Sequence, residues 1–272
     1  MRYVVTGGAG FVGSHLVKLL VKNGHDVTVI DNLIKGKKEN LSHVIEIIKF
    51  LNLDIRDYQE LRKNLMNIDG VFHQAALTIV QDSFERPEEY HEVNVLGTEN
   101  IFKLANENNF KVVYASSSSI YGNTTTIPIH ENSEKNPINP YGVTKLDDEK
   151  LAKKYHNLGL SVIGLRYFNV YGPGEIFKQT TSSMILQLAF QAINIGKVRL
   201  FEFGDQNFDD ILNTIGHPPF SHAFKCNVTL PGDTSRKDCG SGIAGSTPCV
   251  LVVKVSLLSP TPILKKQNQN NT

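Results

Sequence analysis

Cysteine is scarce in this chain and confined to its last quarter. The 272 residues include three cysteines, Cys226, Cys239 and Cys249, and none precedes residue 226. An odd number of cysteines without a signal segment argues against a disulfide framework. No CxxC pair is present, which argues against a structural zinc site. We therefore predict no metal site.

Long apolar runs and a strong charge of either sign are also missing. The formal net charge is +1, with 40% hydrophobic and 20% charged residues, an ordinary balance for a globular chain. We therefore expect no nucleic-acid partner. No apolar run reaches the length of a membrane span, and the N-terminus enters an apolar segment at once, without a signal peptide. The sequence thus predicts a cytoplasmic protein with no membrane partner.

The first thirty residues carry the pattern that organises the rest. An apolar run, Tyr3–Val5, leads into the glycine-rich turn Thr6–Gly13, and a helix-periodic segment follows until Asn23–Gly24. A second apolar run, Val27–Ile30, ends at Asp31. Strand, glycine turn, helix, strand and acidic residue follow one another in the order of a dinucleotide-binding unit. A flexible loop is the alternative interpretation of the glycines, and the flanking strand and helix favour the cofactor site.

Each glycine of the turn has a physical task. Gly7 permits the tight turn, Gly10 lets a pyrophosphate approach the backbone, and Gly13 lets the helix pack close to the strand. The phosphates would then lie at the helix N-terminus. Asp31 could accept hydrogen bonds from an adenosine ribose and would repel a 2′-phosphate, which favours NAD over NADP. Lys35 follows in a basic loop that we interpret as solvated.

Strand-like and helix-like patterns alternate from Arg2 to about Phe201. This alternation predicts an α/β fold with a Rossmann-type doubly wound parallel sheet. The expected strands are residues 3–5, 27–30, 47–53, 70–73, 111–115, 161–165 and 198–201. Five helices are expected. The first follows the glycine turn, the second runs from its N-cap Asp57 to about residue 66, and the third from 87 to about 108. The fourth begins at 141, and the fifth runs from 184 to 195. Asn94 falls inside the third helix, where an asparagine is more often solvated than functional.

Two strand ends carry residues suited to a ligand. Gln74-Ala75-Ala76 follows the fourth strand, and small residues there let a flat ligand lie against the backbone. Tight packing of helix on sheet is the alternative. The serines Ser116–Ser119 follow the fifth strand, at the edge where open α/β sheets place their ligands.

Tyr141 and Lys145 form the sharpest candidate pair. They are four residues apart, so both side chains lie on one face of a helix. A phenol, with a pKa of about 10, is a poor base at neutral pH unless a nearby ammonium stabilises the phenolate. The tyrosine could then take a hydroxyl proton while hydride leaves the same carbon, and a strand-end serine could hold the substrate oxygen. The Tyr-x-x-x-Lys spacing also arises by chance, and the surrounding motifs make chance the weaker interpretation.

These motifs together resemble the extended short-chain dehydrogenase/reductases. Within that family the chain is most similar to NAD-dependent nucleotide-sugar epimerases of the UDP-glucose 4-epimerase type. The resemblance covers roughly residues 1–207 and contains several motifs in order. They are Thr6–Gly13, Asp31-Asn32, His73–Ala76, Ser116–Gly122, Tyr141–Lys145 and Arg166–Asn169.

The resemblance implies a reaction and a set of site residues. Bound NAD would take hydride from C4 of a UDP-hexose and return it to the other face. Tyr141, Ser117 and Lys145 would be catalytic, with Lys145 also touching the nicotinamide ribose. The implied cofactor-binding residues are Gly7, Gly10, Phe11, Val12, Gly13, Asp31, Asn32, Asp54, Ile55, Ala75, Ala76, Asn94, Tyr141, Lys145 and Phe168. The implied substrate-binding residues are Ser117, Ser118, Tyr141 and Asn169. Relatives commonly form homodimers through helices that would include 92–104 and 141–155.

Sister families do other chemistry on the same scaffold. The sugar 4,6-dehydratases carry Asp-Glu where this chain has Ser118 and Ser119, and related decarboxylases usually place Glu at the second position. Hydroxyls do not readily replace a carboxyl acid/base pair near neutral pH. The serines therefore favour epimerisation of UDP-glucose and UDP-galactose. Another sugar epimerase, a dehydratase or a reductase is the alternative enzyme.

The resemblance ends after Asn207, where the composition changes abruptly. The remainder holds all three cysteines and six of the eleven prolines, and it shows no sustained helical period. We divide the chain into an NAD-binding domain (1–170), the start of a small, atypical substrate lobe (171–207) and a divergent tail (208–272). The tail is interpreted as out of frame or otherwise foreign, with a divergent lobe as the alternative. If the tail lacks the groups that hydrogen-bond the sugar diphosphate, the chain would be an inactive, truncated NAD-binding protein.

Overall fold

The computed structural model describes residues 1–124, 128–175, 178, 182–195 and 249–253. The chain divides into two compact units, one of residues 1–168 with 229–254 and the other of residues 169–228 with 255–272. Within the described ranges no helix has the length and apolar character needed to cross a membrane. The expected strand at 198–201 lies outside the described residues.

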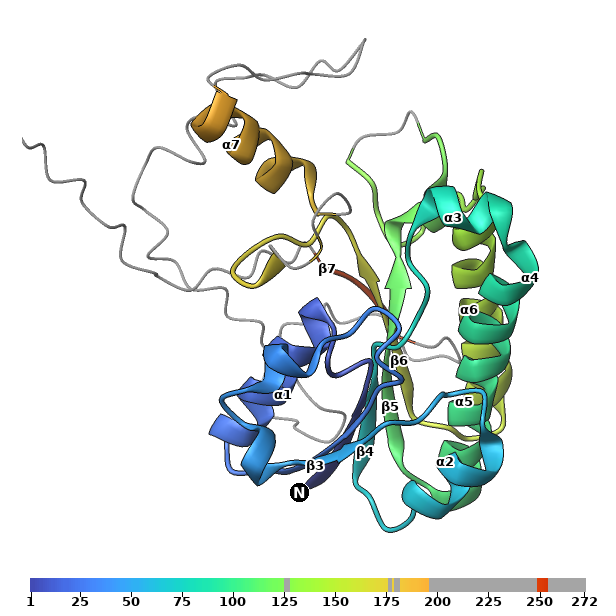
Figure 1. Ribbon diagram of the computed structural model, residues 1–272. Coiled ribbons are helices and arrows are strands. Elements are labelled where there is room, and N and C mark those ends of the chain that lie inside the picture. The colour runs from blue at the N-terminus through green and yellow to red at the C-terminus, as the bar shows by residue number, and fades with distance from the viewer. Residues whose placement is uncertain (125–127, 176–177, 179–181, 196–248, 254–272) are drawn as a thin grey trace, which may run out of the picture. The chain divides into compact units, whose positions relative to one another are not determined.

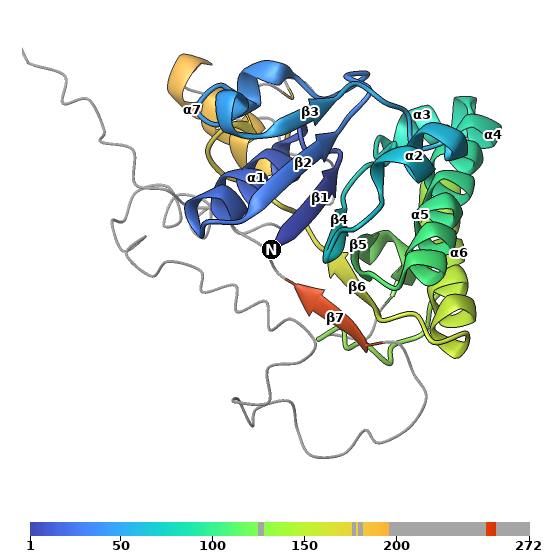
Figure 2. The ribbon, with the colours of Figure 1, turned by 90° about the horizontal axis from the view of Figure 1, so that it is seen from below.

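The first unit is built on a parallel sheet, in which the strand order is β3-β2-β1-β4-β5-β6-β7 (Figures 1 and 2). The strands are β1 (Arg2–Thr6), β2 (Asp26–Ile30), β3 (Lys49–Leu51), β4 (Gly70–His73), β5 (Lys111–Ser117), β6 (Val162–Tyr167) and β7 (Cys249–Val253). Every neighbouring pair is parallel. The order reverses between β1 and β4, and open sheets of this kind bind ligands at such a point, beyond the carboxyl ends of the strands. The predicted doubly wound fold is confirmed.

Helices cover both faces of this sheet, with α1 on one face and α2, α5 and α6 on the other (Figure 2). The α-helices of the first unit are α1 (Phe11–Lys22), α2 (Tyr58–Asn64), α3 (Val80–Glu85), α4 (Pro87–Tyr90), α5 (Gly97–Asn108) and α6 (Pro140–Asn157). Its described residues also form three 3₁₀ turns, η1 (Lys38–Leu41), η2 (Ile45–Ile47) and η4 (Ser118–Tyr121), and one π-helical turn, η3 (His91–Leu96).

Alternation along the strands divides the core into two layers. Val4 packs in a cluster with residues of α2, α5 and α6, whereas its neighbours Tyr3 and Val5 pack in a cluster with residues of α1. The same division separates Val71 from Phe72 on β4. Because successive side chains of a strand point to opposite faces, a sheet covered on both sides needs apolar residues at every position. This explains the continuous apolar runs in the sequence.

The predicted helix from 87 to 108 is confirmed, with an irregularity inside it. It begins as α4 with Pro87 in its first turn, widens into the π-helical turn η3, and continues as α5. Such a turn inserts one residue into the helical ladder and is often found at functional sites. Asn94 lies in this turn and is fully buried. The expectation that it is solvated was wrong.

Other differences are local. The third strand is shorter than its apolar run, because η2 takes up Ile47 and the strand ends at Leu51. The pattern did not predict α3, nor the 3₁₀ turn that takes up the end of the serine run. Asp57 is the N-cap of α2, as predicted, since its carboxylate accepts the Glu60 backbone N–H at 3.0 Å.

The start of α6 is fixed by two residues. Asn139 caps it by accepting the Gly142 N–H at 2.7 Å, and Pro140 follows at the first helical position, where no N–H is needed. Tyr141 therefore lies in the first turn of the helix and Lys145 in the second.

In the second unit, α7 spans Met184–Ile195, as predicted. The Ser183 hydroxyl accepts the Leu186 N–H at 3.3 Å, which caps this helix. The same hydroxyl donates to the buried Glu175 carboxylate at 3.0 Å. Asn169 is the first residue of this unit.

Candidate active site

The glycine turn joins β1 to α1 with very close backbone packing. Gly7 has a φ of +66°, a conformation that favours glycine, and a Cβ on Gly13 would lie 2.1 Å from the Gly7 carbonyl oxygen. No larger residue fits at Gly13 without moving the backbone. A Cβ on Gly10 would meet only the Gly7 oxygen, at 3.1 Å, so this part of the turn is open to a ligand. The turn thus has the geometry that its sequence predicts.

Asp31 lies at the end of β2, beside this turn. Its Oδ2 accepts the Ala9 N–H and its Oδ1 the Leu33 N–H, each at 2.9 Å. Burial raises the pKa of Asp31, and the two backbone N–H groups partly oppose that rise. A Cβ on Gly36 would lie 2.7 Å from Asp31 Oδ1, so the following loop closes over the carboxylate.

A pocket of about 110 Å³ opens between the glycine turn and the ends of β2 and β4. It is lined by Gly7, Gly10, Ile30, Asp31, Asn32, Ile34, Lys35, Gly36, Leu53, Ile55, Gln74, Ala75, Ala76, Leu77 and Val93. The structure therefore gathers seven of the predicted cofactor residues around one cavity. Lys35, interpreted from the sequence as part of a solvated loop, contributes to its wall.

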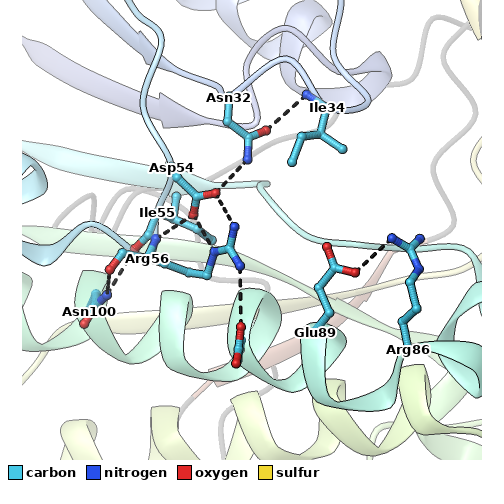
Figure 3. A network of polar contacts seen from close by, with 9 residues as sticks. Asn32, Ile34, Asp54, Ile55, Arg56, Arg86, Glu89 and Asn100 are labelled. Carbon is cyan, nitrogen blue, oxygen red and sulfur yellow. Dashed lines mark hydrogen bonds and ion pairs between the residues drawn. The ribbon is translucent and has the colours of Figure 1, made fainter.

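Asp54 belongs to a polar network beside this pocket (Figure 3). Its carboxylate accepts two hydrogen bonds from the Arg56 guanidinium, at 3.0 and 2.8 Å, and one from Asn32 Nδ2 at 3.0 Å. Hydrogen bonds from Arg56 lower the pKa of Asp54 to about 2. Arg56 also lies 3.5 Å from Glu92 on η3. Asn32 is thereby fixed at the pocket wall by Asp54, which itself does not line the pocket.

The candidate catalytic residues come from α6 and the end of β5. Lys145 Nζ donates to the Ala115 carbonyl on β5 at 3.1 Å. A Cβ on Gly142 would lie 2.7 Å from the Ser119 carbonyl oxygen, so the first turn of α6 packs directly on η4. Ser117, the last residue of β5, is buried, and its hydroxyl accepts the Ser119 N–H at 3.1 Å. The predicted residues therefore lie on two elements in direct contact.

Lys145 has a second partner that the sequence did not single out. Its Nζ lies 2.9 Å from Asp148 Oδ2, and the two side chains are 4% and 0% exposed. Burial acts to lower the pKa of Lys145, but Asp148 and Tyr141 outweigh it, so the pKa is raised. The spacing of three residues on a helix could have suggested the pair. Nothing in the sequence showed that it is buried.

A second buried ion pair joins β6 to α6. Arg166 makes two hydrogen bonds with the Glu149 carboxylate, at 2.7 and 2.8 Å, and a third with the Tyr121 hydroxyl at 2.7 Å. Ser116 donates to Glu149 at 2.8 Å. The Phe168 ring lies 6.4 Å from the Tyr121 ring. This network ties α6, β6 and η4 together, and the sequence analysis assigned no role to Glu149.

Asn94 connects η3 to the loop after β4 and to α6. Its Oδ1 accepts the Leu77 N–H at 2.8 Å, and its Nδ2 donates to the Leu77 carbonyl and the Thr144 hydroxyl, both at 3.0 Å. The oxygen and the nitrogen of the Asn94 side-chain amide are thus both bonded to other protein atoms. Asn169 belongs to the second unit.

The fold and the pocket define an α/β protein of the dinucleotide-binding class. The model of the NAD-dependent epimerase/dehydratase family matches residues 3–210. The chain belongs to this family, whose members use NAD. The match ends within a few residues of Asn207.

Individual relatives carry several activities. The chain is 39% identical over 213 residues to the UDP-glucose 4-epimerase of Halalkalibacterium halodurans, covering 75% of this chain and 63% of the relative. It is 38% identical over 178 residues to a UDP-N-acetyl-alpha-D-glucosaminuronate decarboxylase of Bacillus cytotoxicus, covering 63% of this chain and 55% of that relative. Among solved structures, the UDP-glucose 4-epimerase of Thermotoga maritima with UDP-glucose superposes with a TM-score of 0.70 at 31% identity, covering 75% and 67%. The chain thus spans between about half and two thirds of the length of these curated relatives.

Proposed function

We propose that the protein is an NAD-dependent nucleotide-sugar 4-epimerase acting on UDP-glucose and UDP-galactose. The observation that carries this proposal is the packing of α6 on the end of β5, which brings Tyr141 and Lys145 to the strand that ends in Ser117. NAD, when bound, would take hydride from C4 of the sugar and return it to the other face. Residues of the pocket around Asp31 would hold its adenosine ribose.

The residues present fit this cofactor. The backbone at Gly10 is open, the first N–H groups of α1 can face a pyrophosphate, and Asp31 keeps lone pairs beyond the two N–H groups that it accepts. Tyr141 would take the proton of the sugar 4-hydroxyl, Ser117 would hold the same oxygen, and the Lys145 charge would stabilise the phenolate. Ser118 and Ser119 offer no carboxyl group for the proton transfers of a dehydratase.

Epimerisation and bound NAD, measured on the purified protein with a small panel of UDP-sugars, test this proposal. The Tyr141→Phe variant keeps the ring but loses the acidic hydroxyl, so turnover should fall by about 10²–10⁴-fold while bound NAD is retained. Lys150→Gln, an exposed residue on the same helix, serves as the matched control and should keep wild-type turnover. Turnover by Tyr141→Phe at the wild-type rate would contradict the mechanism.

A second function is favoured by the change in sequence after Asn207. We propose that residues 208–272 are foreign to the family lobe that holds the sugar diphosphate, which would make the chain an NAD-binding protein without turnover. Stoichiometric NAD without epimerisation of any UDP-sugar would support this function over the first. Translating the coding DNA in all three frames tests the origin of the tail, and the absence of a family-like continuation would count against a frame change.

We also infer a homodimer through the helices around η3 and α6, as is common in similar proteins. Leu96 and Val143 lie on these helices and are 45% and 44% exposed. Light scattering on the purified protein measures the mass, and Leu96→Lys with Val143→Lys should yield monomers. A monomeric wild-type protein would exclude the dimer.

A further inference from the structure

A buried carboxylate on α6 stands outside every predicted site. Asp148 is fully buried, and its Oδ2 pairs with Lys145 Nζ at 2.9 Å. Its other oxygen, Oδ1, accepts no hydrogen bond from the described residues. A carboxylate buried with half of its acceptors unused carries a large desolvation cost, so its presence beside the candidate catalytic lysine calls for a physical reason.

A chain of buried polar side chains leads from β1 to this carboxylate. The Thr6 hydroxyl accepts the Ala75 N–H at 3.3 Å and lies 2.6 Å from His73 Nδ1. His73 Nε2 lies 2.9 Å from the Thr98 hydroxyl on α5, and that hydroxyl favours the charged form of Asp148. Thr98 can donate to Asp148 if it accepts from His73, which places the imidazole proton on Nε2 and makes Thr6 the donor to Nδ1.

The titratable groups around the pair lie on β4, β5 and α6. On β5, burial and the charges of Glu149 and Asp148 raise the pKa of Tyr114. His73 on β4 is neutral, because burial and the charge of Lys145 lower its pKa to about 3. On α6, Tyr141 stabilises the Lys145 ammonium and Asp147 repels the Asp148 carboxylate. Burial raises the pKa of Asp148 to about 6, against the opposing effects of Lys145 and Thr98. Asp148 is thus the one carboxylate among the described residues that pairs with the buried ammonium.

We propose that Asp148 is a positioning residue, which keeps the Lys145 side chain charged and directed at β5 beside Tyr141. This inference rests on the role proposed for Lys145. Two of the three N–H donors of Lys145 are used, by Asp148 and by the Ala115 carbonyl. The third has no partner within the described part of the chain and is left for the nicotinamide ribose. The Thr6–His73–Thr98 chain ties the pair to the strand that enters the glycine turn.

The charge of Lys145 can be followed without any turnover. Lysine labelled with ¹³C at Cε reports the titration of each amine by NMR, and Lys145→Met assigns the signal. In Asp148→Asn the carboxylate is lost while burial remains, so the Lys145 midpoint should fall by about one pH unit or more. The matched control is Asp147→Asn, which removes a negative charge from the same helix at a residue paired with Lys150 on its exposed side. An unchanged midpoint in Asp148→Asn would overturn the proposal.

Cofactor affinity distinguishes positioning from a purely structural contact. By titration calorimetry, Asp148→Asn should bind NAD at least several-fold more weakly than Asp147→Asn. In the wild type, affinity should fall as the pH drops through about 6, where Asp148 becomes protonated. A loss of thermal stability at unchanged NAD affinity would mean that the pair is only structural.

A further test uses the unmutated protein, so it can be made even if the Asp148→Asn variant does not fold. A ¹³Cγ label on aspartate should show the buried Asp148 carboxyl ionised at pH 7, with a midpoint that burial raises to about 6. An Asp148 carboxyl that is still protonated at pH 7 would overturn the proposal, because it would not form an ion pair with the Lys145 ammonium. None of these readouts depends on epimerisation. A chain that shows the shifts but turns over no sugar would support the positioning role and sink the proposed enzyme.

Discussion

The two halves of the candidate site are made in different ways. Around the glycine turn, close backbone packing and backbone N–H groups form the walls, as the contacts of Gly7, Gly13 and Asp31 show. Around α6, buried charged side chains form the structure instead, in the pairs Lys145–Asp148 and Arg166–Glu149. The first half tolerates only glycine at certain positions, whereas the second depends on both members of each pair.

This difference has an energetic consequence. A steric conflict in the backbone half, as at Gly13, costs overpacking energy at one position, because backbone atoms have to move. Removing one member of a buried ion pair leaves an uncompensated charge in a low-dielectric interior, which is a larger cost. The stability of the half around α6 should therefore be the more sensitive to single substitutions.

The largest effect on stability should come from Arg166→Met. The 2.7 Å pair with Glu149 is almost fully buried, so the variant leaves the Glu149 carboxylate buried without its cation. It should lose about 3–5 kcal/mol of unfolding free energy. Denaturant unfolding measures this loss. Lys150→Gln breaks an exposed pair of the same length, 2.7 Å, and serves as the control, with no loss resolved from wild type. Equal losses in the two variants would remove the distinction between buried and exposed pairs.

A smaller effect is expected from Gly13→Ala in the backbone half. The new Cβ would meet the Gly7 oxygen at 2.1 Å, and the loss of unfolding free energy should be about 1–3 kcal/mol. Gly10→Ala, whose Cβ meets the same oxygen at 3.1 Å, should fold with less loss but bind NAD more weakly. Calorimetry and denaturant unfolding on both variants separate folding from binding. A Gly13→Ala protein as stable as wild type would show that this turn is more yielding than its contacts indicate.

The smallest effect concerns the acid stability of the network in Figure 3. The pKa of Asp54 is lowered to about 2, from about 3.9 in an unfolded chain. Its stabilising contribution is therefore present above about pH 4 and is lost as the pH falls towards 2. Asp54→Asn and Arg56→Gln should each flatten this part of the stability curve, as measured by thermal unfolding. Curves that follow the wild type in both variants would show that the pair contributes nothing.

The sequence predicted most of the fold, and it selected residues that the structure gathers around one pocket. Gly7, Gly10, Asp31 and the run Gln74–Ala76 line one pocket, because their spacing and their place at strand ends are local features. The spacing of Tyr141 and Lys145 also placed both residues on one face of a helix. It missed the π-helical turn around Asn94, because hydrophobic period alone does not show an inserted residue.

The chain by itself determined the order of strands and helices, the glycine turn and the identity of the family, because these depend on residue type and spacing. Only the tertiary structure decided which charges are buried and paired. Asp148 and Glu149 are adjacent acidic residues on one helix, and sequence gives no reason to treat them differently. Their partners, Lys145 on the same helix and Arg166 on β6, follow from how α6 lies against the sheet, since burial and long-range pairing arise only when separate elements meet.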